Sequence, residues 1–198
     1  SRPLSILPNG PASFAGRKLG ILATDGADAR AFKALTKAVD AAGAVWELVA
    51  PKIGGITLSD GTSVAGRHKI DGGPSVLFDA VALLPSDDGA ALLAGDAAAK
   101  DFVSDAFAHC KFIGHGAEAA PLFAAAGLAD KLDDACIALA KPGDVTAFLD
   151  ACVALRHWPR EAGVDLDAKS GTKEAAETSA SRKAVSAPAA KPASKPAR

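Results

Sequence analysis

The feature that most constrains the fold is an alternation between short apolar runs and segments with helical periodicity. Residues 18–23 and 44–50 are short apolar runs, and the segment between them places Phe32, Leu35 and Val39 on one face of a helix. A strand, a helix and a second strand in this order form a βαβ unit, in which the two strands are parallel and the crossover is right-handed. We therefore predict an α/β fold with a doubly wound, mainly parallel sheet and helices on both of its faces.

The following residues continue this alternation with one interruption. Apolar runs predict three more strands, at residues 79–84, 111–114 and 136–139. Helices are predicted over residues 86–108, with a break near Gly95, then up to about residue 126, and over residues 144–157. Residues 53–66 depart from this rhythm and predict an inserted β-hairpin around the turn Asp60-Gly61.

The two ends of the chain differ in composition from its middle. Residues 1–17 hold three prolines and an Asn-Gly pair without apolar periodicity, which predicts a linker or extended arm. Residues 18–160 are the predicted α/β domain, and order is expected to stop around Trp158 and Pro159. Residues 161–198 are rich in Ala, Lys, Ser and Pro, so they cannot bury enough apolar surface to offset chain entropy, and we predict a disordered basic tail.

Charge and composition restrict the classes of partner. Residues 168–198 hold seven Lys and Arg against two Glu, whereas acidic residues outnumber basic ones in the rest of the chain. An acidic body and a tail without aromatic residues argue against nucleic acid as a partner. No run approaches the ~18 apolar residues that span a bilayer, so no membrane partner is expected.

Cysteine usage and the first residue bear on the context of the chain. Cys110, Cys136 and Cys152 occur singly and at no metal-ligand spacing, which predicts reduced thiols in a cytoplasmic protein. The sequence contains no Met and starts at Ser1, so we expect it to be a piece of a longer protein.

The stretch of residues 111–120 is the main candidate for a functional site. It predicts a buried strand, a Gly-rich turn and an Ala-rich helix, with Gly114 at the sharp corner. In hydrolases with such a junction the corner residue is a Ser or Cys nucleophile, so Gly114 leaves the geometry without a reactive atom. We therefore expect no catalytic residue among Gly114, His115 and Gly116. Backbone N–H groups at the start of the helix predict a residual capacity to bind an anion.

Other functions remain open for this stretch and its neighbours. Residues 114–119 match the dinucleotide-binding pattern G-x-G-x-x-A, but the next predicted strand ends without the acid that binds a ribose. His115 is a candidate general base, or a metal ligand together with His109, although a structural role is favoured because no third ligand stands at a suitable spacing. Cys110 is interpreted as a structural thiol, and Asp25 and Asp28 as caps of the helix that follows them. No metal site is predicted.

The order of elements, the hairpin and two local motifs resemble the class I glutamine amidotransferase-like superfamily, which includes intracellular proteases and deglycase-type stress proteins. Its members carry an acid in the first turn after a strand, and a Cys-His-Gly elbow. The resemblance implies a flavodoxin-like sheet in which Asp28 stands at the acid position. Gly114, His115 and Gly116 would then be a vestigial elbow with Gly114 in the place of the Cys.

Three longer stretches, residues 5–22, 70–84 and 102–114, resemble the C-terminal domain of bacterial large-subunit catalases. This resemblance implies a non-catalytic domain that carries no cofactor and is joined through residues 1–17 to an upstream haem-containing core. The implied partners are this catalase core, which breaks down hydrogen peroxide, and the sister subunits of a homotetramer. A structural, stabilising, assembly or chaperone-like role follows. The alternative is a free-standing amidotransferase-like hydrolase or stress protein that uses Cys110 or His115.

Overall fold

The computed structural model of the chain describes residues 9–163, which fold around a six-stranded sheet with the strand order β5-β2-β1-β6-β7-β8. Every neighbouring pair in this sheet is parallel. The strands are β1 (Lys18–Ala23), β2 (Val45–Ala50), β5 (His68–Lys69), β6 (Ala80–Leu84), β7 (Ile113–His115) and β8 (Cys136–Ala138). Because successive strands are added first to one side of β1 and then to the other, the sheet is doubly wound, as predicted.

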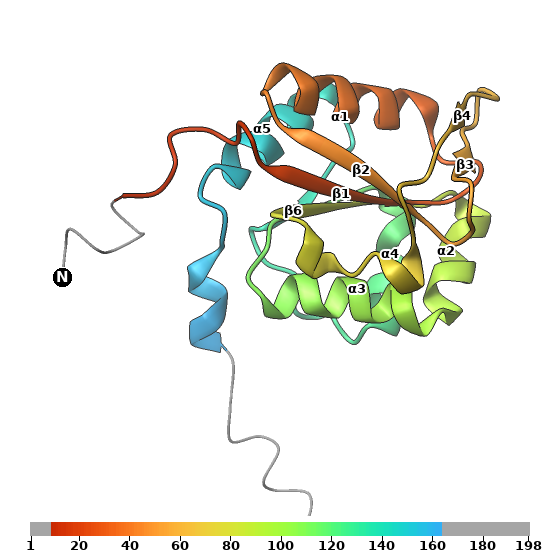
Figure 1. The fold of residues 1–198 in the computed structure, drawn as a ribbon. Coiled ribbons are helices and arrows are strands. Elements are labelled where there is room, and N and C mark those ends of the chain that lie inside the picture. The colour runs from red at the N-terminus through yellow and green to blue at the C-terminus, as the bar shows by residue number, and fades with distance from the viewer. Residues whose placement is uncertain (1–8, 164–198) are drawn as a thin grey trace, which may run out of the picture. The chain divides into compact units, whose positions relative to one another are not determined.

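Helices cover both faces of the sheet (Figure 1). One face is covered by α1 (Ala29–Ala41) and α5 (Pro142–Cys152), which contact each other. The other is covered by α2 (Asp87–Gly95), α3 (Ala97–Ala108) and α4 (Ala120–Ala125). Short 3-10 turns complete the fold: η2 (Ile70–Gly72), η3 (Ser75–Leu77), η4 (Ala117–Ala119) and η5 (Trp158–Gly163).

Each face of the sheet forms its own hydrophobic core. Along β1, Leu19 and Ile21 belong to the core under α1 and α5, whereas Leu22 belongs to the core under α2, α3 and α4. Alternate side chains of a strand point to opposite faces, so a strand covered on both sides is apolar at nearly every position. This is why the central strands were recognisable as continuous apolar runs.

The inserted hairpin is confirmed. Its strands β3 (Ile56–Thr57) and β4 (Ser63–Val64) are antiparallel and flank the Asp60-Gly61 turn. It lies at the edge of the sheet where the parallel strands end, which we call the carboxyl edge (Figure 1). Asp25 binds the hairpin rather than capping α1: its carboxylate accepts the backbone N–H of Thr57 at 2.9 Å and pairs with Lys52.

The structure differs from the sequence prediction at three element ends. β7 extends to His115, and α5 ends at Cys152 rather than near residue 157. The chain also stays ordered beyond Trp158, because Arg160 is buried and hydrogen-bonded within the domain. Within the predicted arm, Phe14 packs into the core, but residues 1–8 and the predicted tail from residue 164 onward lie outside the described residues, so the domain limits stay a prediction.

None of the helices in residues 9–163 is long and apolar enough to cross a membrane.

Candidate functional site

The carboxyl edge holds three of the four residues that the superfamily resemblance pointed to. Asp28, His115 and Gly116 line one cavity of about 330 Å³, which also includes Glu118. The turn after β1 contributes Asp28, the end of β7 contributes His115, and the turn after β7 contributes Gly116 and Glu118. Gly114 does not line the cavity, because it lies inside β7, paired with Ala82 on one side and Ile137 on the other.

Asp28 serves as the N-terminal cap of α1, as predicted. Its Oδ1 accepts the backbone N–H groups of Ala31 at 3.0 Å and Arg30 at 2.7 Å. The hydrogen bond from Ala31 is the largest influence that lowers the pKa of the Asp28 carboxyl, so this side chain is a poor proton acceptor. A carboxylate already bonded to two N–H groups is suited to hold a helix end rather than to activate a nucleophile.

His115 is held by its own turn. Its Nδ1 lies 3.1 Å from the carbonyl oxygen of Gly116, and its ring packs edge-on against Phe123 with the ring centroids 5.2 Å apart. The Glu118 carboxylate leans back over the same turn, since a Cβ atom built on Gly116 would lie 2.7 Å from its Oε2. Sequence analysis assigned no role to Glu118, although it belongs to the quoted motif.

The electrostatics of this cavity argue against the predicted binding of an anion. Asp28 and Glu118 both contribute carboxylates to the lining, and like charges would repel an anionic group. The N–H groups after Gly116 begin a single 3-10 turn, and the following α4 is only six residues long. Such short segments supply little of the helix dipole on which anion binding depends.

Gly114 does not occupy the sharp corner, contrary to the sequence prediction. The turn begins at Gly116, whose φ is −73°, and Gly114 is absent from the glycines with positive φ. Packing favours a glycine at 114 for a different reason: a Cβ atom there would lie 2.9 Å from Leu139 Cδ1 and 3.2 Å from Phe148 Cζ, so both side chains would have to shift. The close approach of α5 and the chain after β8 therefore fills the space that a side chain would need.

The described residues supply no nucleophile to the cavity. Its lining contains no Ser, Thr, Cys, Lys or Tyr. Cys110 and His109 both precede β7 in the chain, so they lie at the edge where strands begin, which we call the amino edge. His115 lies at the other end of the same strand, which separates it from His109 as a metal partner. Within residues 9–163 no group of three or more His, Cys, Asp or Glu side chains is placed to hold a metal ion.

The other two thiols are poorly suited to nucleophilic chemistry. Burial raises the pKa of Cys136 to about 11 and raises the pKa of Cys152 further. A thiol with a raised pKa carries little of the reactive thiolate at neutral pH.

Hydrogen bonds join the two sides of the crevice where doubly wound sheets commonly bind ligands, and a hollow of about 360 Å³ lined by Thr24, Asp25 and Gly89 lies beside them. The crevice lies between β1 and β6, where the direction of winding reverses. The Ser86 N–H donates to Thr24 Oγ1 at 2.9 Å, and Ser86 Oγ donates to the Asp25 carbonyl oxygen at 2.7 Å. Ser86 Oγ also accepts the N–H of Gly89, so it caps α2 as well. The glycine-rich motif lies away from this point, after β7, which disfavours the dinucleotide alternative.

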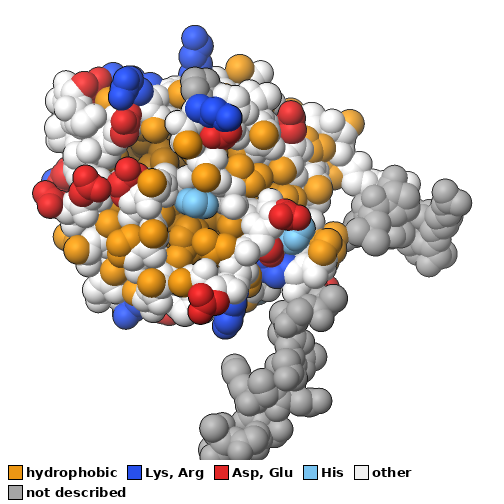
Figure 2. Space-filling view, turned by 180° about the vertical axis from the view of Figure 1, so that it is seen from behind, with side chains coloured by type: hydrophobic (Ala, Val, Ile, Leu, Met, Phe, Trp, Pro, Cys, Tyr) orange, Lys and Arg blue, Asp and Glu red, His pale blue; other side chains and the backbone are white. Residues whose placement is uncertain are grey.

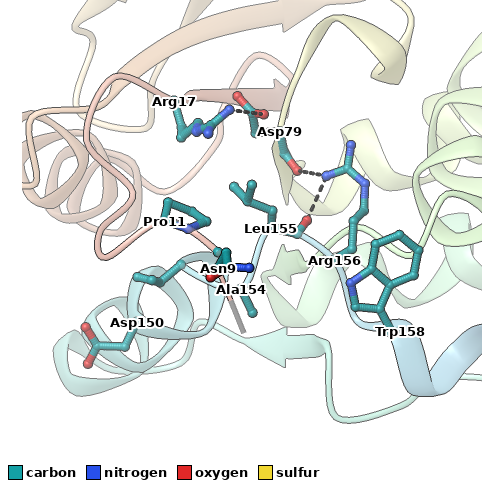
Figure 3. Close-up of a pocket in the computed structure, with 11 residues that line it drawn as sticks. Asn9, Pro11, Arg17, Asp79, Asp150, Ala154, Leu155, Arg156 and Trp158 are labelled. Carbon is teal, nitrogen blue, oxygen red and sulfur yellow. Dashed lines mark hydrogen bonds and ion pairs between the residues drawn. The ribbon is translucent and has the colours of Figure 1, made fainter. Parts of the chain in front are cut away.

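A larger hollow, of about 1040 Å³, lies at the amino edge and was not foreseen from the sequence. It lies between the start of the described chain, residues 9–11, and residues 153–158 (Figure 3). Arg17 pairs with the Asp79 carboxylate at 3.8 Å. Arg156 Nη1 donates to the carbonyl oxygens of Asp79 and Leu155 at 3.1 and 2.7 Å.

Buried cations support the structure beside this hollow. Lys111 is 2% exposed, and its ammonium donates to the carbonyl oxygens of Ser75 and Phe78. Burial, and secondarily the charge of Arg156, lower the pKa of Lys111 to about 8. Sequence reasoning missed this role, because a Lys at the start of an apolar run has the same local pattern whether its side chain is buried or exposed.

Arg160 fastens the last described turn to the body of the domain. It forms two hydrogen bonds to Asp133, of 2.6 and 2.7 Å, and stacks over Phe107 with its Cζ atom 4.0 Å from the ring centroid. The same guanidinium donates to the carbonyl oxygens of Phe107 and Lys111. Asp133 and Arg160 are 27 residues apart, so no local pattern in the sequence indicated their pairing.

The surface itself offers little to a polyanion. Seen from behind the view of Figure 1, hydrophobic side chains occupy most of the middle of this face, and Lys and Arg are scattered near its margins (Figure 2). On this face there is no basic patch of the kind that nucleic-acid binding needs.

Comparison with known proteins connects the chain to one family. Residues 15–162 match the family model of a C-terminal domain found in long catalases. Catalase C of Rhizobium meliloti is 52% identical over 166 residues, which cover 84% of this chain and 24% of that protein. Catalase HPII of Mycobacterium avium is 33% identical over 136 residues, which cover 67% of this chain and 19% of that protein. The chain thus spans about a quarter or less of the length of these curated relatives.

A solved structure supports the fold independently. A two-domain protein of Anabaena variabilis, with DJ-1/ThiJ/PfpI-like and ferritin-like domains, superposes with a TM-score of 0.59 at 14% sequence identity. The match covers 70% of this chain and 49% of that chain. At this identity the likeness concerns the α/β fold alone.

Proposed function

The chain belongs to the family of C-terminal domains found in long catalases, and from this membership we propose that it is a non-catalytic domain that stabilises a larger catalase and its assembly. The chemistry of the whole protein, the breakdown of hydrogen peroxide at a haem, would take place in an upstream core. The sister subunits of a homotetramer are the further partners that this role requires.

One observation carries the non-catalytic part of the proposal. The position at which the related fold would carry its nucleophile is Gly114, and the space beside it is filled by Leu139 and Phe148. The neighbouring cavity contains Asp28, His115 and Glu118 without a hydroxyl or thiol side chain. It therefore lacks the kind of nucleophile that an acid and an imidazole activate in Ser and Cys hydrolases.

The haem of the proposed parent does not fit a site in this chain. The sequence contains no Tyr, so a tyrosinate ligand is absent. The His115 Nδ1 faces the Gly116 carbonyl oxygen and its ring is packed against Phe123, in a cavity that two carboxylates share. We therefore assign the haem to the core and derive no step of its chemistry from this domain.

The test compares the full-length parent catalase with a form truncated before residue 1. We expect truncation to lower the temperature of half-inactivation and to weaken subunit assembly, measured by residual activity after heating and by light scattering. Peroxide turnover per haem should remain unchanged in the cold, because no residue of this chain touches the haem. Equal heat resistance and assembly of the two forms would remove the proposed role.

The competing hydrolase function predicts a reactive thiol. Iodoacetamide should label Cys110, Cys136 and Cys152 of the native protein no faster than it labels a model thiol, and all three should react after unfolding in urea. A single cysteine that is labelled much faster than glutathione in the native protein would favour the hydrolase.

A further inference from the structure

We propose that the amino edge of the sheet is the surface through which this domain packs against the upstream catalase core. The inference rests on the proposed function and names the contact that it requires. The surface consists of the groove in Figure 3, which Trp158 lines, and of exposed apolar side chains at the same edge of the sheet. We call it the amino-edge surface, and its apolar members are Val45, Val76, Leu77, Leu132 and Trp158.

Exposed large hydrophobic side chains are unequally distributed over the described residues. The five apolar side chains of the amino-edge surface are 39–68% exposed. Four of them precede or begin a strand, and Trp158 lies in the turn that Arg160 fastens to the domain. The other two exposed examples, Ile53 and Leu92, lie toward the carboxyl edge. Apolar side chains concentrated on one side of a domain indicate a protein–protein contact, whereas isolated ones do not.

The amino-edge surface is held rigidly, although its apolar side chains face outward. Lys111 binds two carbonyl oxygens of the η3 region and so holds Val76 and Leu77 in place. Arg160, through Asp133 and the carbonyl oxygen of Lys111, holds the turn that carries Trp158. A buried cation is costly unless its hydrogen bonds are satisfied, and here the hydrogen bonds of Lys111 and Arg160 go to the segments that carry the exposed apolar side chains. These segments are therefore ordered before any partner binds, which lowers the entropy cost of a protein–protein contact.

The position at which the chain enters the domain identifies the occupant. Asn9 and Pro11 line the groove, and residues 9–17 run from it into β1 at the same end of the sheet as Trp158 (Figures 1 and 3). Whatever precedes residue 9 is thus tethered at the rim of the groove, which raises its effective concentration there to the millimolar range or above. Catalase C of Rhizobium meliloti is about 3.5 times as long as this chain, and the family is described as a C-terminal domain, so the catalase core is the part that we expect before residue 1.

The groove also specifies the chemistry of its partner. Arg156 donates from Nη1 to the carbonyl oxygens of Asp79 and Leu155, and it lines the groove together with Trp158 (Figure 3). The remaining N–H groups of a guanidinium suit a carboxylate or a main-chain carbonyl. The contacting surface of the core is therefore apolar, with one such acceptor opposite Arg156.

The first experiment is carbene photolabelling of the intact full-length catalase with a diazirine reagent, which needs no peroxide. We expect Trp158 and Leu77 to take up several-fold less label than Ile53 and Leu92, because the core covers only the amino edge. Equal labelling at the two edges would overturn the inference.

The second experiment places a charge at each edge of the same full-length protein. Leu77→Lys is expected to lower the temperature of half-inactivation and to speed proteolysis within residues 9–17. Ile53→Lys is the matched control at the carboxyl edge and is expected to change neither measurement. If truncation weakens the parent but Leu77→Lys behaves like its control, the stabilising role stands and the assignment of the surface is wrong. If truncation has no effect on heat resistance or assembly, the proposed stabilising function is wrong, and the assignment of the surface is wrong with it.

Discussion

A side chain at position 114 would displace its neighbours, because a Cβ atom there would lie 2.9 Å from Leu139 Cδ1 and 3.2 Å from Phe148 Cζ. We expect Gly114→Cys to destabilise the domain by about 1–3 kcal/mol, the usual cost of overpacking a core. This corresponds to a fall in melting temperature of roughly 2–4 °C per kcal/mol for a chain of this size. The substitution should create no hydrolase activity, because the residue lies inside β7 and outside the Asp28 cavity.

The matched control for this change is Gly95→Ala. A Cβ atom at position 95 would meet nothing within 4 Å, and the residue lies in the last turn of α2. The free energy of unfolding of the Gly95→Ala variant should equal that of the wild type or exceed it by up to about 1 kcal/mol, because alanine favours a helix more than glycine does. Urea unfolding measures both variants, and equal stability of Gly114→Cys and wild type would contradict the packing explanation.

Lys111 makes stability depend on pH in a defined window. Its pKa is about 8 in the folded protein against 10.5 for an unperturbed Lys. Between these values the unfolded chain binds more protons than the folded protein, so the free energy of unfolding contributed by this group rises with pH. Relative to Lys111→Met, the wild type should gain stability between about pH 8 and 10.5. Urea unfolding at pH 7.5, 8.5 and 9.5 measures this, and a relative loss over that range would show that the ammonium is not desolvated.

Among the elements, η5 depends on one side chain for its attachment. Arg160→Ala would remove two hydrogen bonds to Asp133 and two to carbonyl oxygens of the body. We expect a loss on the order of 3 kcal/mol, because a partly buried carboxylate is left unpaired. Amide hydrogen exchange within residues 153–163 should also become faster.

A surface arginine provides the comparison. The Arg30 side chain is 96% exposed and lies 4.0 Å from Asp28, so Arg30→Ala should cost no more than about 1 kcal/mol. Thermal unfolding followed by circular dichroism distinguishes the two variants. Similar losses for both would mean that the Arg160 contacts contribute nothing specific.

The elements that sequence reasoning predicted well are those with a local physical signal. The central strands are apolar at nearly every position because both of their faces are buried, and Asp60-Gly61 is a strong hairpin turn. Asp28 was recognised as a cap because that role depends on its two near neighbours in sequence. β5 is only two residues long, and such a short strand carries no recognisable alternation.

The misplaced corner and the missed cations depend on distant residues. The side chains that crowd a Cβ atom at Gly114 come from positions 139 and 148. Lys111 binds carbonyl oxygens of residues 75 and 78, and Arg160 pairs with the carboxylate of residue 133, so these partners are also remote in sequence. For the candidate site, the superfamily resemblance named Asp28, Gly114, His115 and Gly116, of which all but Gly114 line one cavity, but it could not show that Glu118 turns back over the same cavity. Such contacts are set by tertiary packing rather than by periodicity.

For the molecule as a whole, the two cores should unfold together. Strands β1 and β6 contribute side chains to both, so neither core can be lost while the other keeps its sheet. Trp46 packs edge-on against Phe32 on the α1 side and reports on one core, whereas circular dichroism reports on all helices. In a Trp158→Phe background, the Trp46 fluorescence and circular dichroism transitions in urea should coincide. Two separated midpoints would show that the layers are independent.

The filling of the space beside Gly114 by Phe148 has a consequence for how such a domain can evolve. Restoring a cysteine at 114 meets the ring of Phe148, whereas truncating Phe148 first would open a void at a typical cost of about 3–5 kcal/mol. Either step alone removes a large share of the 5–15 kcal/mol by which domains are usually stable. The two positions are therefore expected to show strong epistasis, with Gly114→Cys and Phe148→Ala less harmful together than their separate effects imply. A larger side chain at 114 is therefore expected to be accommodated best together with a smaller one at 148, so that substitutions at the two positions are expected to occur as a pair.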